Sequence, residues 1–374
     1  MNVDHFRSPR PRTICFPFLG RTVGGSTIAA MALATALPAP WQPLFVLHER
    51  GSLSAHLDAA GVPYEVLPLP AMIGDDLQRL PVLLQVARAT PGLMGFLRRR
   101  KIGIVHANDG RMNVTWAGAA QLAGSGFIWH QHSRYQSSRF GNAFARAADR
   151  IIGVSSFATA AIPAALQGRV RIIPNPFDVA KAVPNRAAAR RDLIQSLGLD
   201  PGALILGYFG NLTEQKRPVV FAQAVEMIRR REPRAVGVLC GELREPLAEV
   251  LRGYAGTRLM GFQFPPEPIL AACDLLLAPA AREGFGRAVV EAMLVGTPVI
   301  AARSGGHIDI VRDGETGILV PLDDPQALAE AALGLLASPE RCRTLADAAA
   351  KHAVQAYPLD AHVEAVLRTY AEVW

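Results

Sequence analysis

The sequence predicts an α/β protein with two doubly wound, parallel-sheet domains that face a cleft. The chain has 374 residues, which is more than one ordinary hydrophobic core fills, and this length favours two domains. Its composition is globular, because 50% of the residues are hydrophobic and 19% are charged. Short buried strands alternate with helices over the first half, and the alternation begins again near Leu204, which indicates two parallel sheets.

The first half of the chain is expected to form one sheet with helices on its faces. Each expected strand is a short apolar run followed by turn residues and then by a helical pattern. Leu80 to Arg100 is expected to form a long helix that breaks near Pro91, because proline lacks the N–H of the helix hydrogen bond. The expected strands are 13–18, 43–48, 62–67, 102–107, 126–132, 150–155 and 170–173, and the other expected helices are 27–37, 52–60, 114–123 and 138–148.

The second half repeats this arrangement. Asn175 to Asp178 has turn chemistry and marks the domain boundary, and Asp324 before Pro325 is typical of a helix N-cap. These patterns indicate an N-terminal domain, 1–178, a C-terminal domain, 179–356, and a final helix, 357–374. The expected strands are 204–209, 236–240, 257–260, 275–278 and 299–302, and the expected helices are 185–197, 219–230, 247–254, 266–272, 287–295, 328–336, 342–352 and 359–373.

The chain has the composition of a cytoplasmic protein. Met1 to Thr13 is polar and basic and lacks the apolar run of a signal peptide. No stretch offers the run of about eighteen apolar residues that a membrane span needs. The four cysteines have neither metal-type spacing nor the pattern of a disulfide framework, which favours free thiols in a reducing compartment.

The positive charge of the chain suggests an anionic partner. The net charge is +7 and the pI is about 9.6. Arg98 to Lys101 is the densest basic run, and further positive charge lies at Arg7 to Arg12 and at Arg229 to Arg231. These runs fit either solvated helix ends or a peripheral location on the inner face of the cytoplasmic membrane. Nucleic acid is not expected, because no aromatic residues interleave with the basic runs.

The stretch from Pro279 to Pro321 contains the strongest signal for a ligand site. Glu283 and Glu291 stand eight positions apart across the junction of a loop and a helix. The backbone N–H groups near Phe285 and Gly286 open that helix, and such a terminus favours a phosphate. Two acids beside a phosphate site suggest a ligand that has both hydroxyls and phosphates, and a nucleotide sugar fits this description.

Two further loops follow strands and open helices. Lys216-Arg217-Pro218 places positive side chains beside a helix N-terminus, where they suit a diphosphate or form a solvated basic turn. Gly20 to Ser26 is a glycine-rich turn after the first strand, and its pattern is neither a dinucleotide fingerprint nor a P-loop. That turn has either a ligand-binding or a purely structural role.

His130 and His132 occupy alternate positions of one expected strand and therefore project from the same face. His132 stands at the carboxyl end, where ligands of parallel sheets bind, whereas His130 is interpreted as structural. A zinc pair is the alternative, but no third ligand has suitable spacing nearby. The chain contains no D-x-D pair, so a carboxylate-bound metal that bridges a diphosphate is not supported.

Taken together, these motifs resemble the GT-B retaining glycosyltransferases of family 4. Glu283 to Arg287 followed by Glu291-Ala292-Met293 is similar to the E-x7-E motif of that family, and Gly305-Gly306 continues the pattern. Gly207 to Leu212 with Lys216 to Pro218 resembles its phosphate-binding segment. The resemblance implies two Rossmann-like domains, with the acceptor in the first and the nucleotide sugar in the second. It also implies that the final helix, 357–374, returns towards the first domain.

The resemblance also implies a role for each matching residue. Glu283, Lys216 and His132 would be the catalytic residues, which contact the sugar hydroxyls, the diphosphate and the anomeric centre, respectively. Glu291 would bind the ribose. The remaining donor-binding positions are Gly24, Gly25, Asn211, Arg217, Phe262, Phe285, Gly286 and Arg287. Asn211 stands where many members have an arginine, so one phosphate contact would be either missing or replaced by Arg217.

The implied reaction is the transfer of a sugar, with retention, from a UDP- or GDP-sugar to a hydroxyl of a glycan or a lipid-linked acceptor. Cell-surface polysaccharide, lipopolysaccharide or glycolipid synthesis would use such a reaction. No metal and no separate cofactor are expected. A nucleotide-sugar epimerase or hydrolase is one alternative, and a non-catalytic nucleotide-sugar-binding protein is the other.

Overall fold

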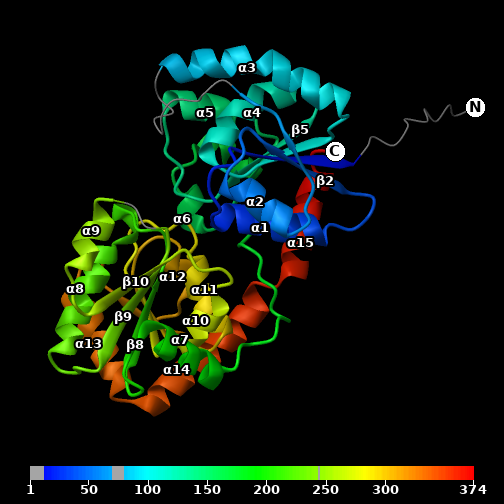
Figure 1. Cartoon of the computed structure of the whole chain (residues 1–374). Helices are drawn as coiled ribbons and strands as arrows, with labels where there is room; N and C mark the ends of the chain where they lie inside the picture. Colours follow the sequence, from blue (N-terminus) through cyan, green and yellow to red (C-terminus); the bar gives the residue numbers. More distant parts are fainter. Residues whose placement is uncertain (1–11, 70–79, 243–244) are drawn as a thin grey trace, which may run out of the picture. The chain divides into compact units, whose positions relative to one another are not determined.

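The computed structural model describes residues 12–69, 80–242 and 245–374. The chain divides into two compact units, one formed by Met1–Phe177 with Leu359–Trp374 and the other by Asp178–Pro358. The last helix therefore belongs to the first unit (Figure 1). Most of the basic run from Arg7 to Arg12 lies outside the described residues.

The first unit contains a parallel sheet of seven strands in the order β3-β2-β1-β4-β5-β6-β7. Helices α3, α4 and α5 cover one face, and α1, α2 and α15 cover the other (Figure 1). The strands are β1 (Thr13–Phe18), β2 (Gln42–Leu47), β3 (Tyr64–Val66), β4 (Ile104–Ala107), β5 (Gly126–Gln131), β6 (Arg150–Gly153) and β7 (Val170–Ile172). The predicted doubly wound sheet is confirmed, with strand ends that differ from the prediction by a few residues.

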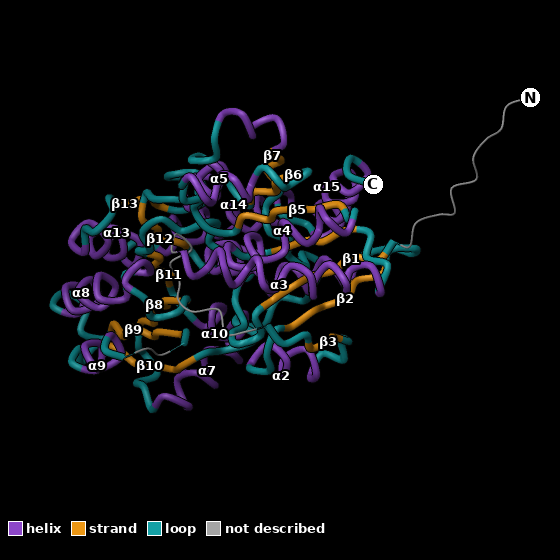
Figure 2. Tube along the Cα trace, turned by 90° about the horizontal axis from the view of Figure 1, so that it is seen from above, coloured by secondary structure: helices purple, strands orange, loops and turns teal. Residues whose placement is uncertain are grey.

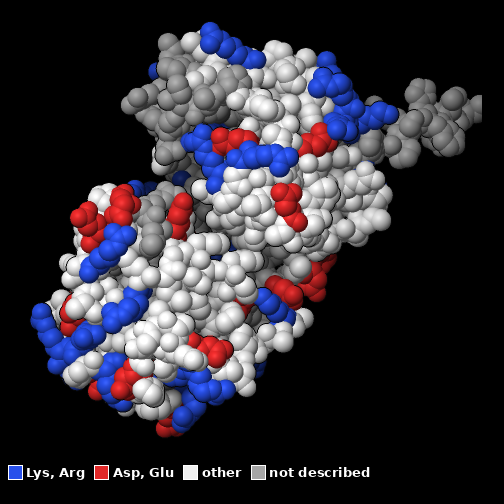
Figure 3. Space-filling model, in the orientation of Figure 1, with Lys and Arg blue, Asp and Glu red and all other residues white. Residues whose placement is uncertain are grey.

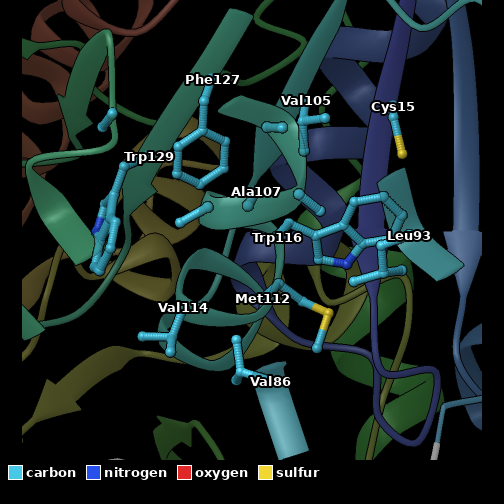
Figure 4. Close-up of a cluster of buried hydrophobic side chains, with 14 of the residues drawn as sticks. Cys15, Val86, Leu93, Val105, Ala107, Met112, Val114, Trp116, Phe127 and Trp129 are labelled. Carbon is cyan, nitrogen blue, oxygen red and sulfur yellow. The ribbon is translucent and has the colours of Figure 1, made fainter. Parts of the chain in front are cut away.

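A buried cluster holds the α3–α5 layer on this sheet. Trp116 on α4 is fully buried and lies among apolar side chains of β4, β5 and α3 (Figure 4). The helices of the unit are α1 (Gly25–Ala36), α2 (Ser52–Ala59), α3 (Leu80–Arg99), α4 (Gly110–Ala123), α5 (Arg139–Ala145), α6 (Ser156–Thr159), the 3-10 helix η1 (Ala164–Arg169) and α15 (Leu359–Ala371). The sequence missed the short helices α6 and η1.

The predicted break of the long helix near Pro91 is wrong, because α3 continues through this residue. Val86 and Ala89 before the proline and Leu93 after it are all buried in the same cluster, so both halves of the helix are held on the sheet. Burial of this apolar stripe outweighs the one hydrogen bond that proline removes. Thr90 donates its hydroxyl to the Val86 carbonyl at 2.8 Å within this stretch.

The second unit contains a parallel sheet of six strands in the order β10-β9-β8-β11-β12-β13 (Figure 2). Helices α8, α9 and α13 pack on one face, and α7 and α10 pack on the other. The strands are β8 (Leu204–Phe209), β9 (Ala235–Cys240), β10 (Thr257–Gly261), β11 (Leu275–Ala278), β12 (Val299–Ala302) and β13 (Ile318–Val320). The second predicted sheet is confirmed, and β13 is an edge strand that the sequence did not predict.

The predicted N-cap of α13 is confirmed, because Asp324 accepts a hydrogen bond from the Ala327 N–H at 2.8 Å. Gly296, after α11, has a left-handed φ of 74°, which is typical of a residue that follows a helix. The helices are α7 (Arg186–Leu197), the 3-10 helix η2 (Glu214–Lys216), α8 (Pro218–Arg229), α9 (Leu247–Arg252), α10 (Glu267–Ala272), α11 (Arg287–Leu294), α12 (His307–Ile310), α13 (Pro325–Leu336) and α14 (Pro339–Ala356). The short helix α12 was also missed.

Within the described ranges, no helix combines the length and the apolar character that a bilayer crossing requires. Figure 3 shows positive side chains in several places on the face that it draws. Arg98 and Arg99 are the last residues of α3, and Arg100 and Lys101 follow directly. These four residues are exposed, although Arg98 donates to the Leu122 carbonyl and Arg100 pairs with Glu65.

Candidate functional site

The candidate site of the second unit lies where β8 and β11 end. These strands are neighbours and parallel, so the loops after them meet at one edge of the sheet. The ammonium of Lys216, after β8, forms an ion pair with the carboxylate of Glu283, after β11. Their side chains are 29% and 15% exposed. The structure therefore brings together two residues that the sequence places 67 positions apart.

Backbone contacts hold the two loops in register. The carbonyl of Gln215 accepts from the Ala281 N–H at 2.8 Å, and the Gln215 side-chain amide donates to the Arg282 carbonyl at 3.1 Å. The buried ring of Tyr208 packs against Phe221 beneath this junction. Because these contacts join the two loops directly before Lys216 and Glu283, the two residues are positioned before any ligand binds.

The environment of Glu283 keeps its carboxylate ionised. Burial alone would raise its pKa, but the positive charge of Lys216, the nearby His307 and a hydrogen bond from the Gly284 N–H together lower the pKa below its usual value. An ionised carboxylate is an acceptor without a proton to donate. Glu283 is therefore suited to bind hydroxyl groups.

His307 is a residue of this site that the sequence analysis missed. It is buried at the start of α12, and its Nδ1 lies 3.2 Å from the Ala302 carbonyl oxygen. Its ring lies against Gly286, since a Cβ built there would stand 2.9 Å from the ring. Burial lowers the pKa of His307, with a smaller opposing effect from Glu283. The available signal was its place directly after Gly305-Gly306, the glycine pair of the family pattern.

The glycine pair allows a close approach of two backbone segments. Gly305 has a left-handed φ of 60°, and a Cβ there would lie 2.3 Å from the Glu283 carbonyl oxygen. The Gly306 N–H donates to that same oxygen at 2.7 Å. Side chains at these positions would push away the loop that holds Glu283, so the pair is part of the support for the site.

We expect Gly305→Ala to destabilise the fold by about 3 kcal/mol, because it combines left-handed strain with overpacking against backbone. The unfolding midpoint in urea measures the effect. Gly314→Ala is the matched control: Gly314 has a φ of 77° but open space around its Cα, so only about 1 kcal/mol of strain is expected. Equal losses in the two variants would show that the contact with the Glu283 loop contributes nothing.

Glu291 lies on α11, which begins after Gly286 without a side-chain cap. Arg287 donates to the Glu291 carboxylate at 3.1 Å, one helical turn away. Burial raises the pKa of Glu291; Arg287 opposes this effect, and the carboxylate of Glu267 adds to it. Lys181 pairs with Glu267 beside this group. The two glutamates of the motif thus lie in different environments, and only Glu283 has a lowered pKa.

Arg217 does not join Lys216 and Glu283 in this structure. Its guanidinium forms a bidentate ion pair with the Asp323 carboxylate, with Nε–Oδ1 and Nη2–Oδ2 distances of 2.6 and 3.2 Å. The backbone of Arg217 has a left-handed φ of 56°. Asn211 accepts a long hydrogen bond of 3.3 Å from the Glu242 N–H. No local pattern indicates the contact with Asp323, because the partners are 106 residues apart.

The two phenylalanines of the prediction differ in exposure. The ring of Phe285 is buried and lies edge-on to Tyr357, with centroids 5.5 Å apart, so its side chain supports the loop. Phe262 is 52% exposed and stacks with Phe264, which is equally exposed. Phe262 is therefore the one of the two whose ring is accessible to a ligand.

The predicted residues of the first unit lie at the carboxyl ends of its strands. Gly24 is extended and precedes Gly25, the first residue of α1, and this helix also lacks a side-chain cap. His132 follows β5, and its Nε2 lies 3.2 Å from Asn108 Oδ1. The ring of His130 contacts it at a centroid distance of 4.0 Å. In the described part of the chain, no group of three or more His, Cys, Asp or Glu side chains is arranged to hold a metal ion.

Two family models match the chain, one on each unit. The model described as "Glycosyltransferase Family 4" matches residues 23–181, and the model described as "Glycosyl transferases group 1" matches residues 203–338. The second match contains Lys216, Glu283, Glu291 and the glycine pair.

Known proteins are similar to this chain in sequence and in fold. The D-inositol 3-phosphate glycosyltransferases of Corynebacterium urealyticum and Actinosynnema mirum are 32% and 31% identical to it, over 50% and 60% of this chain and 48% and 58% of their own length. The chain thus spans about half the length of the curated relatives it matches. Among solved structures, Alr3699/HepE of Anabaena, in complex with UDP and glucose, has a TM-score of 0.78 at 24% identity, with 96% of this chain and 99% of that one covered. WaaG, a glycosyltransferase involved in lipopolysaccharide biosynthesis, has a TM-score of 0.71 at 17% identity, with 96% and 99% covered.

The two parallel sheets and these structural neighbours define a GT-B fold. The chain belongs to the GT-B glycosyltransferases of family 4, also described as glycosyl transferases group 1.

Proposed function

We propose that the protein is a retaining glycosyltransferase that moves a sugar from a nucleotide-diphosphate sugar to a hydroxyl of a glycan or a lipid-linked acceptor. The ion pair of Lys216 with an ionised, buried Glu283 is the observation that carries the proposal. One group suits phosphate and the other suits sugar hydroxyls, and both occupy one loop junction. Family membership supports the same class of reaction.

The proposal assigns each charged group a part in donor binding. Lys216 stabilises the negative charge that develops on the leaving diphosphate, and the open N-terminus of α11 adds backbone donors. Glu283 accepts from hydroxyls of the transferred sugar, and Glu291 accepts from the ribose. His132, Gly24 and Gly25 of the first unit provide further contacts, to the anomeric centre and the phosphates of the donor.

Similar proteins favour UDP as the nucleotide. Alr3699/HepE is known in complex with UDP and with UDP-glucose. The similar proteins include D-inositol 3-phosphate glycosyltransferases and WaaG, a glycosyltransferase involved in lipopolysaccharide biosynthesis. The acceptor class in this proposal is a hydroxyl of a glycan or a lipid-linked molecule in cell-surface polysaccharide or glycolipid synthesis. The reaction as proposed needs no metal ion, because Lys216 and helix N-termini supply the positive charge.

A thermal-shift screen of UDP, GDP and their sugars, followed by product analysis, tests the function. We expect one nucleotide sugar to raise the melting temperature, transfer to require an acceptor, and the α-configured donor to give an α-linked product in the presence of EDTA. Turnover of the nucleotide sugar at the same rate with and without an acceptor would indicate an epimerase or hydrolase. Donor binding without product from any supplied acceptor would indicate a nucleotide-sugar-binding protein. Loss of transfer in EDTA would contradict the metal-free proposal.

We also propose that the protein is cytoplasmic and binds the inner face of the membrane through Arg98 to Lys101. The exposed run lies at the end of α3, and a surface lysine or arginine contributes about 1 kcal/mol near anionic lipid. We expect co-sedimentation with phosphatidylserine vesicles, with weaker binding when the four residues are changed to Gln. A variant with Arg229 to Arg231 changed to Gln is the control. Equal binding by wild type and the first variant would contradict a role for this run.

A further inference from the structure

A chain of buried polar side chains joins the C-terminal helix to the candidate residue His132. The hydroxyl of Tyr370, on α15, lies 2.6 Å from His106 Nδ1 on β4. His106 Nε2 lies 3.0 Å from His130 Nδ1 on the neighbouring strand β5. The ring of His130 then contacts the ring of His132. Tyr370 and His106 are fully buried and His130 is 2% exposed, so water does not compete for these hydrogen bonds.

The charge states of these buried side chains follow from their burial. Burial lowers the pKa values of His106 and His130 well below the usual value, and nearby His132 and His362 act in the same direction. Burial also raises the pKa of Tyr370. The network therefore consists of a protonated phenol and two neutral imidazoles, each of which has one N–H and one acceptor nitrogen.

The hydrogen-bond direction follows from counting partners. If Tyr370 donates to His106 Nδ1, then His106 Nε2–H donates to His130 Nδ1, and His130 has its proton on Nε2. The reverse direction would leave both the Tyr370 hydroxyl hydrogen and the His130 Nε2 lone pair unsatisfied. In the described part of the chain His130 Nε2 has no hydrogen-bond partner, so the first direction leaves the smaller number of groups without partners.

We propose that Tyr370, His106 and His130 are positioning residues for His132, and that they hold His130 as the Nε2–H tautomer against the His132 ring. This inference rests on the proposed function, in which His132 lies beside the donor. Neither imidazole can rotate or change tautomer without breaking a buried hydrogen bond. We call Tyr370, His106 and His130 the relay. Through the relay, the final helix supports the site, although Tyr370 is 264 residues from His106 in the sequence.

The His130 Nε2–H group, which has no acceptor in the described part of the chain, is consistent with a role in positioning His132. A buried N–H without an acceptor costs about 1–3 kcal/mol, and such costs are commonly retained at functional sites. The cost here falls on the one residue of the relay that contacts His132. A purely structural packing role would not require a polar group at this position.

The tautomers can be read directly by nitrogen NMR of protein labelled with 15N-histidine. We expect a single Nε2–H tautomer for His106 and His130 in the wild type. Tyr370→Phe removes the donor that sets the direction, so both tautomers should appear. His106→Gln keeps the relay, because its amide oxygen accepts from Tyr370 and its amide N–H donates to His130. His106→Leu should release the His130 tautomer.

Transfer kinetics give the second readout. We expect Tyr370→Phe and His106→Leu to lower kcat about tenfold or more with little change in the donor KM, because His132 loses its alignment in the transition state. His106→Gln should retain wild-type kcat. Melting curves check that each variant folds.

Two kinds of result would overturn the relay: an Nδ1–H tautomer of His130 in the wild type, or equal losses in His106→Gln and His106→Leu. The NMR result stands even if no nucleotide sugar turns over, so failure of the relay and failure of the proposed function are distinguishable.

Discussion

Glu283→Gln should lower kcat/KM for the nucleotide sugar by about a hundred- to a thousandfold, the range seen when one well-placed polar group is removed from a transition state. The amide has nearly the same size as the carboxylate, but it has no charge. Its NH2 group would face the Lys216 ammonium, donor against donor, or would replace the acceptor that the sugar hydroxyls need. Initial rates over a range of donor concentrations measure the change.

Glu330→Gln is the matched control for this experiment. Glu330 lies on α13 of the same unit, is 61% exposed and pairs with Arg231, so the same chemical change there should leave the rate unaltered. Circular dichroism should show that both variants fold. If Glu283→Gln folds and retains the wild-type rate, Glu283 does not contact the donor in the transition state.

Much of the fold could be predicted because its strands are short buried runs between turns. β1, β8, β11 and β12 have the predicted bounds, and each consists mainly of buried residues. The edge strand β13, with three residues, was missed because so short a run contains no period that separates it from a loop. The helix α3 was predicted wrongly at Pro91, because a local rule about proline does not include the burial of the stripe around it.

In the candidate site too, features with a local sequence pattern could be predicted, whereas contacts between distant residues could not. The sequence predicted that Glu283 and Lys216 each follow a strand, and in the structure these strands are parallel neighbours and the two side chains form an ion pair. It could not locate His307 beneath Gly286, or the pairing of Arg217 with Asp323, because neither contact has a local pattern. Likewise the sequence pattern favours a structural role for His130 and contains no sign of its contact with His106, which lies on the neighbouring strand β4.

Lys216→Ala should lower kcat/KM by about a hundredfold or more, because the departing diphosphate loses its nearest positive side chain. It should also destabilise the protein, since Glu283 is 15% exposed and would lose its ion partner. The loss should lie between the roughly 1 kcal/mol of a surface pair and the roughly 3–5 kcal/mol of a fully buried pair. Lys351→Ala, on the exposed side of α14, is the control for removal of a lysine.

The pH dependence of that destabilisation separates the charge of Lys216 from its packing. In the wild type the pKa of Glu283 lies below its ordinary value of 4.5, so its contribution to stability is present above that pH and is lost as the pH falls through the folded-state pKa. In Lys216→Ala, burial is opposed only by His307 and the Gly284 N–H, so the pKa of Glu283 rises relative to the wild type. The difference in unfolding free energy between the two proteins should therefore be largest at about pH 7 and shrink below about pH 4.5. A difference that stays constant over this range would mean that Lys216 stabilises the loop by packing, and the electrostatic basis of the proposed site would fail.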